Sequence, residues 1–189
     1  MGIRRFEDKA PQLGERVFVD PDATVIGDVV LGDDCSVWPR AVIRGDMHAI
    51  RIGARVSIQD NAVLHITHDS RFNPGGFALQ IGDDVTLAHQ AMLHGCTLGN
   101  RVMVGMQAIV MDGAVVEDDV IIGGLSGVHQ WVRIGQGAII GAVTMVTNDV
   151  IPYGLVQAPR GGLDGLNLVG LKRRGVPRAD ITALRAAFQ

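Results

Sequence analysis

The sequence predicts an all-β repeat fold, a coil of short parallel strands, from three observations. Aliphatic residues recur every six positions along most of the 189 residues. Gly often follows directly, as in Ile52-Gly53, and a small or β-branched residue tends to come four positions after the aliphatic one, as at Cys35 and Val102. A six-residue period fits neither a 3.6-residue helix nor a simple alternating strand, whereas a fixed internal period indicates structural repeats.

Each six-residue unit is expected to form one side of the coil, and three sides to close one turn. The aliphatic side chains then point inward and stack on those of the next turn, with neighbouring strands about 4.8 Å apart. The inward positions are Val19, Val25, Leu31, Val37, Ile43, Ile52, Ile58, Leu64, Ile81, Leu87, Leu93, Leu98, Val104, Val110, Val116, Ile122, Val128, Ile134, Ile140 and Val146.

The chain is expected to divide into an N-terminal segment (1–16), the coil (17–151) and a C-terminal helical cap (152–189). Leu166–Arg174 reads as a short helix closed by Gly175, and Pro177–Phe188 as a second helix with Pro in its first turn. A coil of repeats exposes its inner face at its ends, so we expect this tail to cap the open end.

Composition argues against several classes of partner. The net charge is −3 and no basic stripe is present, so we expect neither a nucleic-acid nor an anionic-membrane partner. The N-terminus lacks the apolar run of a signal peptide, and no stretch of about 18 apolar residues occurs. We therefore expect a cytoplasmic protein. Its two cysteines, Cys35 and Cys96, do not suggest a disulfide.

Three histidines are candidates for one metal site. Assigning every third unit to one face places His65 and His94 in one column on adjacent turns, and stacks Asp60 under His89 near the preceding corner. A catalytic zinc site uses three protein ligands and keeps an open position. Because His89 lies on another side of the coil, we expect a homotrimer in which it faces His65 and His94 of a neighbour. The alternative is that these histidines are hydrogen-bonded surface residues.

The flanking segments WPRAVIRGD, RIGARVSIQDNAVLHITH, IGDDVTLAHQAMLHG and GNRVMVGMQA resemble γ-class carbonic anhydrases. Those proteins belong to the hexapeptide-repeat proteins, which form left-handed parallel β-helices, so the resemblance supplies the expected handedness. It implies a set of metal ligands, namely His65, His89 and His94. It also implies roles at the subunit contact and around the metal for Arg44, Asp46, Gln59 and Asp60.

The activity implied by this resemblance is that of a lyase, the reversible hydration of CO2 to bicarbonate. The ion would be Zn, or Fe or Co, since imidazole suits several metals, and it would supply hydroxide from water near neutral pH. Gln59 or Asp60 would hold the water or order the interface. An equally open alternative for Arg44 is a plain salt bridge to Asp46 or Asp60 of a neighbouring chain.

After about Gly123 the sequence changes character. The segments NDVIPYG and LNLVGLKRRG resemble the UDP-N-acetylglucosamine acyltransferases of lipid A synthesis. That resemblance implies former sugar-nucleotide contacts at Asn167 and Arg173, with His129 near the acyl-transfer site, and His94 coincides with the general base of those enzymes.

A second histidine is expected three residues before His94, where Ala91 stands. We therefore interpret the chain as a fusion of two homologous β-helices, natural or engineered, joined near Gly123–Val128. The hypotheses are a metalloenzyme, an acyltransferase and an inactive chimera.

Overall fold

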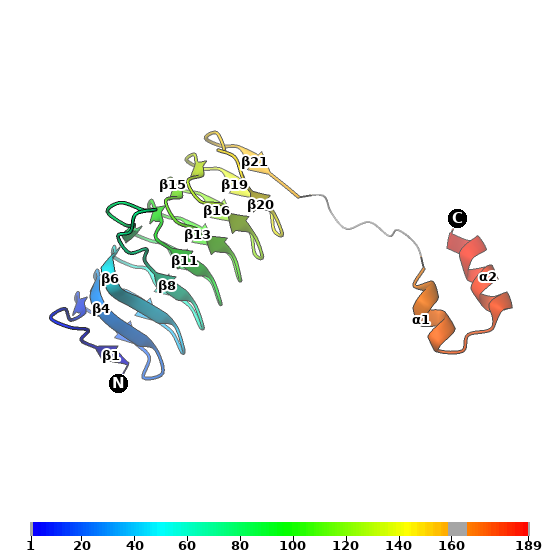
Figure 1. The fold of residues 1–189 in the computed structure, drawn as a ribbon, viewed down its shortest axis with the longest axis horizontal. Coiled ribbons are helices and arrows are strands. Elements are labelled where there is room, and N and C mark those ends of the chain that lie inside the picture. Colours follow the sequence, from blue (N-terminus) through cyan, green and yellow to red (C-terminus); the bar gives the residue numbers. More distant parts are fainter. Residues whose placement is uncertain (1, 159–165, 189) are drawn as a thin grey trace. The chain divides into compact units, whose positions relative to one another are not determined.

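The structure, a computed structural model, describes residues 2–158 and 166–188. It divides into two compact units, Met1–Ala158 and Pro159–Gln189. The first is a coil of short strands and the second contains two helices (Figure 1). The predicted fold class, a left-handed parallel β-helix followed by a short helical tail, is confirmed. In the described part of the chain, no helix is long and apolar enough to cross a membrane.

The coil has three faces, and within each face every strand pairs in parallel with the strands of the turns before and after it. The first face consists of β3 (Phe18–Val19), β5 (Ser36–Val37), β7 (Ser57–Ile58), β10 (Thr86–Leu87), β13 (Met103–Val104), β16 (Ile121–Ile122), β19 (Ile139–Ile140) and β21 (Leu155–Val156). The second face consists of β1 (Ile3–Arg4), β8 (Val63–His65), β11 (Met92–His94), β14 (Ile109–Val110), β17 (Gly127–Val128) and β20 (Met145–Val146). The third face consists of β2 (Gln12–Leu13), β9 (Leu79–Ile81), β12 (Thr97–Leu98), β15 (Val115–Val116) and β18 (Arg133–Ile134).

Two long strands, β4 (Thr24–Leu31) and β6 (Val42–Ile52), run along the second face and turn onto the third. Their pairing shifts register between Gly27 and Val29. A Cβ atom on Gly27, whose φ is +79°, would lie 2.2 Å from the Gly45 carbonyl oxygen, so only glycine allows this close approach.

The interior of the coil is filled by the aliphatic residues that the six-residue period selects. From Val25 to Val146 every one of them is buried, and Val19 packs partly buried against the end of the stack. The inward strand position alternates with an outward one, as in β4, whose burial alternates residue by residue.

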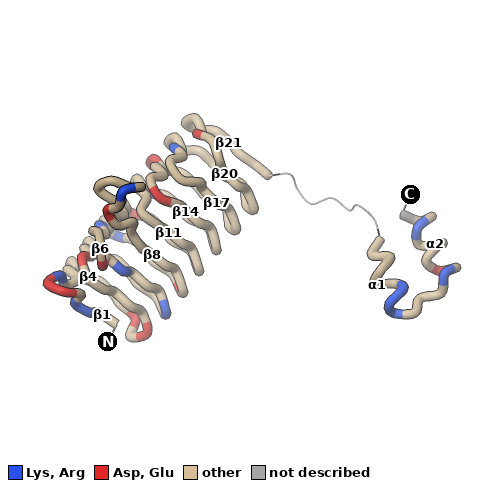
Figure 2. The backbone as a smooth tube through the Cα atoms, viewed as in Figure 1, with Lys and Arg blue, Asp and Glu red and all other residues tan. Residues whose placement is uncertain are grey.

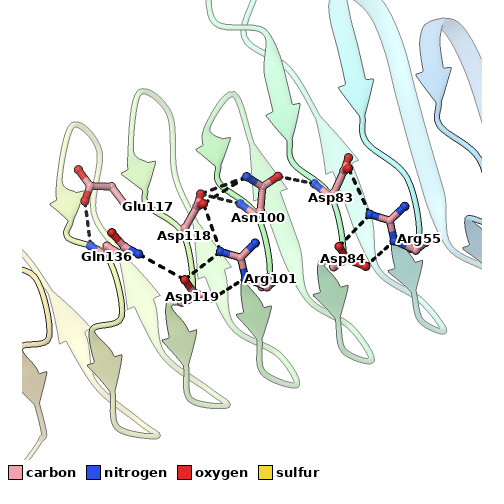
Figure 3. Close-up of polar contacts among 9 residues, drawn as sticks. All are labelled: Arg55, Asp83, Asp84, Asn100, Arg101, Glu117, Asp118, Asp119 and Gln136. Carbon is pink, nitrogen blue, oxygen red and sulfur yellow. Dashed lines mark hydrogen bonds and ion pairs between the residues drawn. The ribbon is translucent and has the colours of Figure 1, made fainter.

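The corners between faces are turned by residues in the left-handed conformation, many of them not glycine. At the corner between the third and first faces, Asp83, Asn100 and Asp118 each accept a backbone N–H from a neighbouring turn, at 2.9 Å in every case. Arg55 and Arg101 pair with carboxylates along the same corner (Figure 3). This ladder supplies the partly buried corner amides with acceptors and ties each turn to the next.

The helices of the second unit are α1 (Leu168–Arg173) and α2 (Arg178–Phe188). Asn167 caps α1, because its side chain accepts the Gly170 N–H at 2.8 Å. Gly175, with φ +70°, follows α1 as predicted. The expected capping of the coil by this unit stays a prediction.

Candidate functional site

His65 and His94 lie side by side on the second face, as the column assignment predicts. They end β8 and β11, and the two residues are direct partners in the parallel register. Their rings are tilted at 59° with centroids 5.0 Å apart. Nδ1 of His65 lies 3.0 Å from Nε2 of His94.

A carboxylate holds the opposite nitrogen of each ring. Nε2 of His65 is 2.9 Å from Oδ1 of Asp46, and Nδ1 of His94 is 2.7 Å from Oδ1 of Asp112. The Thr67 hydroxyl donates a hydrogen bond to the same Asp112 oxygen. Histidines that bind metal ions almost always donate their second N–H to such a partner, which fixes the tautomer and the ring orientation.

These contacts decide which ring nitrogens carry hydrogen. A carboxylate only accepts, so the nitrogen facing it must be N–H. In the neutral rings, Nδ1 of His65 and Nε2 of His94 therefore both present lone pairs, and these point at each other across 3.0 Å. The arrangement is unfavourable unless a cation lies between them. Two imidazoles on one tetrahedral ion, with bonds of about 2.0–2.1 Å, have nitrogens roughly 3.3 Å apart, so the donor pair fits such an ion.

Three of the groups around the histidine pair have shifted pKa values. Burial, together with the charge of Arg44, holds the pKa of His65 below its ordinary value despite the opposing effect of Asp46. Burial raises the pKa of Asp46, but hydrogen bonds from His65 and the backbone, with the charge of Arg44, bring it below the usual range. The pKa of Asp112 is raised by burial and lowered more by its bonds to Thr67 and His94.

His89 lies at the other edge of the second face, where β10 turns into β11. Its Nδ1 is 3.0 Å from Oδ2 of Asp60, which leaves Nε2 as the free nitrogen. His94 lies five positions after His89, at most about 17 Å away if the chain between them were extended. Among the described residues, no three His, Cys, Asp or Glu side chains of a single chain lie together so that they could hold an ion.

The remaining candidates from the resemblances occupy different places. Arg44 pairs with Asp46 of its own chain, and a salt bridge to a neighbouring chain's carboxylate stays an alternative. Gln59 precedes Asp60 at the His89 corner, and its backbone N–H donates to the Leu87 carbonyl at 2.9 Å.

Besides His94, the acyltransferase resemblance names residues in both units of the chain. His129 is exposed in the column beyond His94, and Ala91 is buried in the core. Asn167 is committed to capping α1, and Arg173 is exposed at the end of that helix.

Comparison with known proteins gives two family models and several relatives. One model, bacterial transferase hexapeptide (six repeats), matches residues 10–45. The other, domain 2 of UDP-N-acetylglucosamine O-acyltransferase, matches residues 149–189. The acyl-(acyl-carrier-protein)–UDP-N-acetylglucosamine O-acyltransferase of Rhizobium leguminosarum is 36% identical over 183 residues, which are 94% of this chain and 67% of the relative. The chain belongs to the bacterial hexapeptide-repeat transferase family.

Relatives of the chain carry several kinds of name, among them acyltransferase, gamma carbonic anhydrase and Protein YrdA. The acyltransferase of Paracoccus denitrificans is 56% identical over 143 residues, which are 75% of this chain and 53% of the relative. Gamma carbonic anhydrase 2 of Arabidopsis thaliana is 42% identical over 136 residues, 71% of this chain and 48% of the relative. The chain thus spans about half the length of these curated relatives.

Among solved structures, the Francisella novicida UDP-N-acetylglucosamine acyltransferase aligns over 100% of this chain and 78% of its own length. Its TM-score is 0.71 at 20% identity, so it supports the fold alone. Both predicted resemblances are therefore found among hexapeptide-repeat proteins, and a composite origin of the chain stays a hypothesis.

Sequence reasoning missed two residues of the site, Asp112 and Thr67. Asp112 is 18 residues beyond His94, close to one turn of three six-residue units. That stride was the available signal. Thr67 begins the long insertion after β8. The insertion folds back on its own start, where Phe77 forms an antiparallel bridge with Thr67. No repeat period predicts where an insertion of this kind folds.

Proposed function

We propose that the chain binds one divalent metal ion, Zn, Fe or Co, between two copies, with His65 and His94 from one copy and His89 from the next. The observation that carries this proposal is the pair of facing lone pairs on His65 and His94, each ring held from behind by a carboxylate. His89 has a looser contact of the same kind, with Nδ1 at 3.0 Å from Oδ2 of the partly exposed Asp60. Three imidazoles with oriented free nitrogens match the ligand set of a catalytic zinc site.

The outer surface of the coil supports a trimer as the assembly. The second face lies between the His89 corner and the His65–His94 corner, so turning this face toward a three-fold axis brings one corner to the other corner of the next copy. Its outward strand residues include Val42, Val63, Met92, Ile109 and Met145. The outward residues of the third face include Arg51, Gln80, Thr97 and Arg133, beside Val30 and Val115. Apolar groups therefore line the second face. The first face also exposes large apolar residues, at Met103, Ile121, Ile139 and Leu155, so it is the position of the histidine corners that selects the second face for the trimer.

The reaction we propose is the reversible hydration of CO2. When bound, an ion of this kind makes water a nucleophile near neutral pH. Asp46 and Asp112 hold His65 and His94 in the tautomers that bind, and Asp60 lies beside Nδ1 of His89. Gln59, next to Asp60 on the His89 side, would orient the water or the substrate once the corners meet. Arg44 fixes Asp46 and carries positive charge near an anionic product.

The test divides the ligands between chains. His89→Ala chains and His65→Ala/His94→Ala chains each lack a complete site, but mixed trimers rebuild some sites. Co-refolding the two should restore part of the metal content, measured by elemental analysis, and part of any hydratase activity. Mixed trimers without recovered metal would refute the division of ligands. A metal-loaded monomer of the unmodified chain in sedimentation would refute the interface site altogether.

Acyl transfer to a UDP-amino-sugar is the second candidate, and the comparisons favour it more than the site does. The first relatives include acyltransferases at up to 56% identity, and residues 149–189 match an acyltransferase domain. His94 backed by Asp112 also has the form of an oriented general base. Against this role, the nitrogen that would take the proton faces His65 at 3.0 Å instead of open space.

A further inference from the structure

Toward the C-terminal end of the coil, exposed apolar residues replace polar ones at the corner where the first face meets the second. At the corner between the first and second faces, residues in the left-handed conformation follow one another turn by turn: Arg40, Asn61, Gln90, Gln107, Leu125 and Val143. The first four are polar and the last two are apolar. Leu125 is 60% exposed and Val143 is 64% exposed. Figure 2 shows that β17 and β20, next to these corners, carry almost no charged residues.

The backbone does not require apolar residues at these two positions. Leu125 has φ +61° and Val143 has φ +61°, and a β-branched residue is especially unfavourable there. Asn or Gly would turn the same corner at lower cost. The corner hydrogen bonds, from Leu125 N–H to the Met106 carbonyl and from Val143 N–H to the Gly124 carbonyl, use only the backbone. A strained, exposed aliphatic side chain therefore points to burial by a surface outside the coil, and we take a second copy as that surface.

The opposite corner of the second face presents an aromatic surface at the same turn as Leu125. Trp131, 61% exposed, follows β17, while Leu125 precedes it. The Trp131 ring lies on Gly113, where an added Cβ would be 2.4 Å from the ring. It also meets Phe77 edge to face, with centroids 4.8 Å apart at 81°. The Trp131 ring is thus held in place by its own chain and leaves an apolar side exposed.

We propose that Leu125 of one copy packs on the Trp131–Phe77 pair of the next, forming an apolar clasp beyond the metal site. The inference rests on the proposed trimer. His89 precedes β11 and His94 ends it, so both belong to the same turn of the coil. Joining His89 of one copy to His94 of the next therefore places corresponding turns of the two copies at the same height along the three-fold axis. Level turns then place the Leu125 corner, before β17, against the neighbour's Trp131 corner, after β17. Val143 extends the contact by one turn.

The test uses Leu125→Asn, with Tyr153→Asn as the matched control. Tyr153 is also left-handed, with φ +58°, and 77% exposed, but it lies at the corner between the third and first faces, away from the axis. Asn tolerates both corners, so neither change should unfold the coil. Sedimentation of a dilution series should show the half-dissociation concentration of Leu125→Asn raised at least about tenfold, because each trimer loses three central apolar contacts. Tyr153→Asn should leave it unchanged.

Gln130 directly precedes Trp131, so in the proposed trimer it lies near Leu125 of the next copy. A second variant, Leu125→Cys/Gln130→Cys, treated with a short bis-maleimide, should therefore cross-link into covalent trimers. Cys35 and Cys96 are buried and do not compete. Suppose the unmodified chain is a trimer that holds metal. If Leu125→Asn then leaves the half-dissociation concentration unchanged, or the cysteine pair does not cross-link, the clasp is overturned and the proposed function stands. A trimer without metal that Leu125→Asn dissociates overturns the metal site and keeps the clasp. A monomeric unmodified chain overturns both.

Discussion

Replacing Asp112 tests whether the carboxylate behind His94 makes that ring a metal ligand. Asp112→Ala removes the acceptor of the Nδ1–H, 2.7 Å away, and leaves the imidazole free to rotate or to change tautomer. In the other tautomer Nε2 carries hydrogen and cannot bind an ion. We therefore expect weaker metal binding without a loss of the coil, since the Asp112 side chain is one-quarter exposed, at 25%.

The magnitude follows from the hydrogen bond that is lost. A bond to a charged partner contributes about 1.5–3 kcal/mol, and the partial exposure of Asp112 places it toward the lower end of that range. At 1.4 kcal/mol per factor of ten, the loss corresponds to roughly 10–30-fold in metal affinity. Asp112→Asn, which keeps an acceptor oxygen, should lose only a few-fold. Thr67→Val, which removes the hydroxyl that holds Asp112, should also lose only a few-fold.

The assay is zinc competition against a chromophoric chelator, with NMR of the His94 ring nitrogens as a readout of the tautomer. Asp118→Ala is the matched control. Asp118 accepts the backbone N–H of Asn100 at 2.9 Å (Figure 3). It lies at the corner between the third and first faces, whereas the histidines border the second face. An unchanged zinc affinity in Asp112→Ala, alongside a large loss in His94→Ala, would refute the orienting role. An equal loss in Asp118→Ala would show a general effect on the fold.

Two further outcomes are expected. The folded-state pKa values of Asp46 and Asp112 lie below 3.8 and that of His65 lies below 6.5, so the unfolded chain takes up each proton first as the pH falls. The thermal midpoint of metal-free protein should therefore decline below about pH 6.5 and again below about pH 4, and a flat profile would contradict these shifts. The unmodified chain should transfer no acyl group to a UDP-amino-sugar above the level of His94→Ala, and product above that level would support the second candidate instead.

The sequence by itself determined the coil and the placement of its histidines on faces. Side chains alternate inward and outward along each strand and three six-residue sides close a turn, so the period fixes which residues stack. That is why His65 and His94 could be placed on adjacent turns, and Asp60 beside His89, before any coordinates. The two helices followed in the same way from local signals, Gly175 and Pro177.

Only the tertiary structure decided which nitrogen of each imidazole is free. That choice depends on the side-chain directions of Asp46 and Asp112, which the repeat period does not specify. The place of Thr67 depends on how the insertion after β8 folds back to Phe77. The aromatic corner depends likewise on the Trp131 ring turning toward Gly113 and Phe77. A period fixes the position of a Cα atom on the coil, whereas packing against residues distant in the chain fixes where the side chain points.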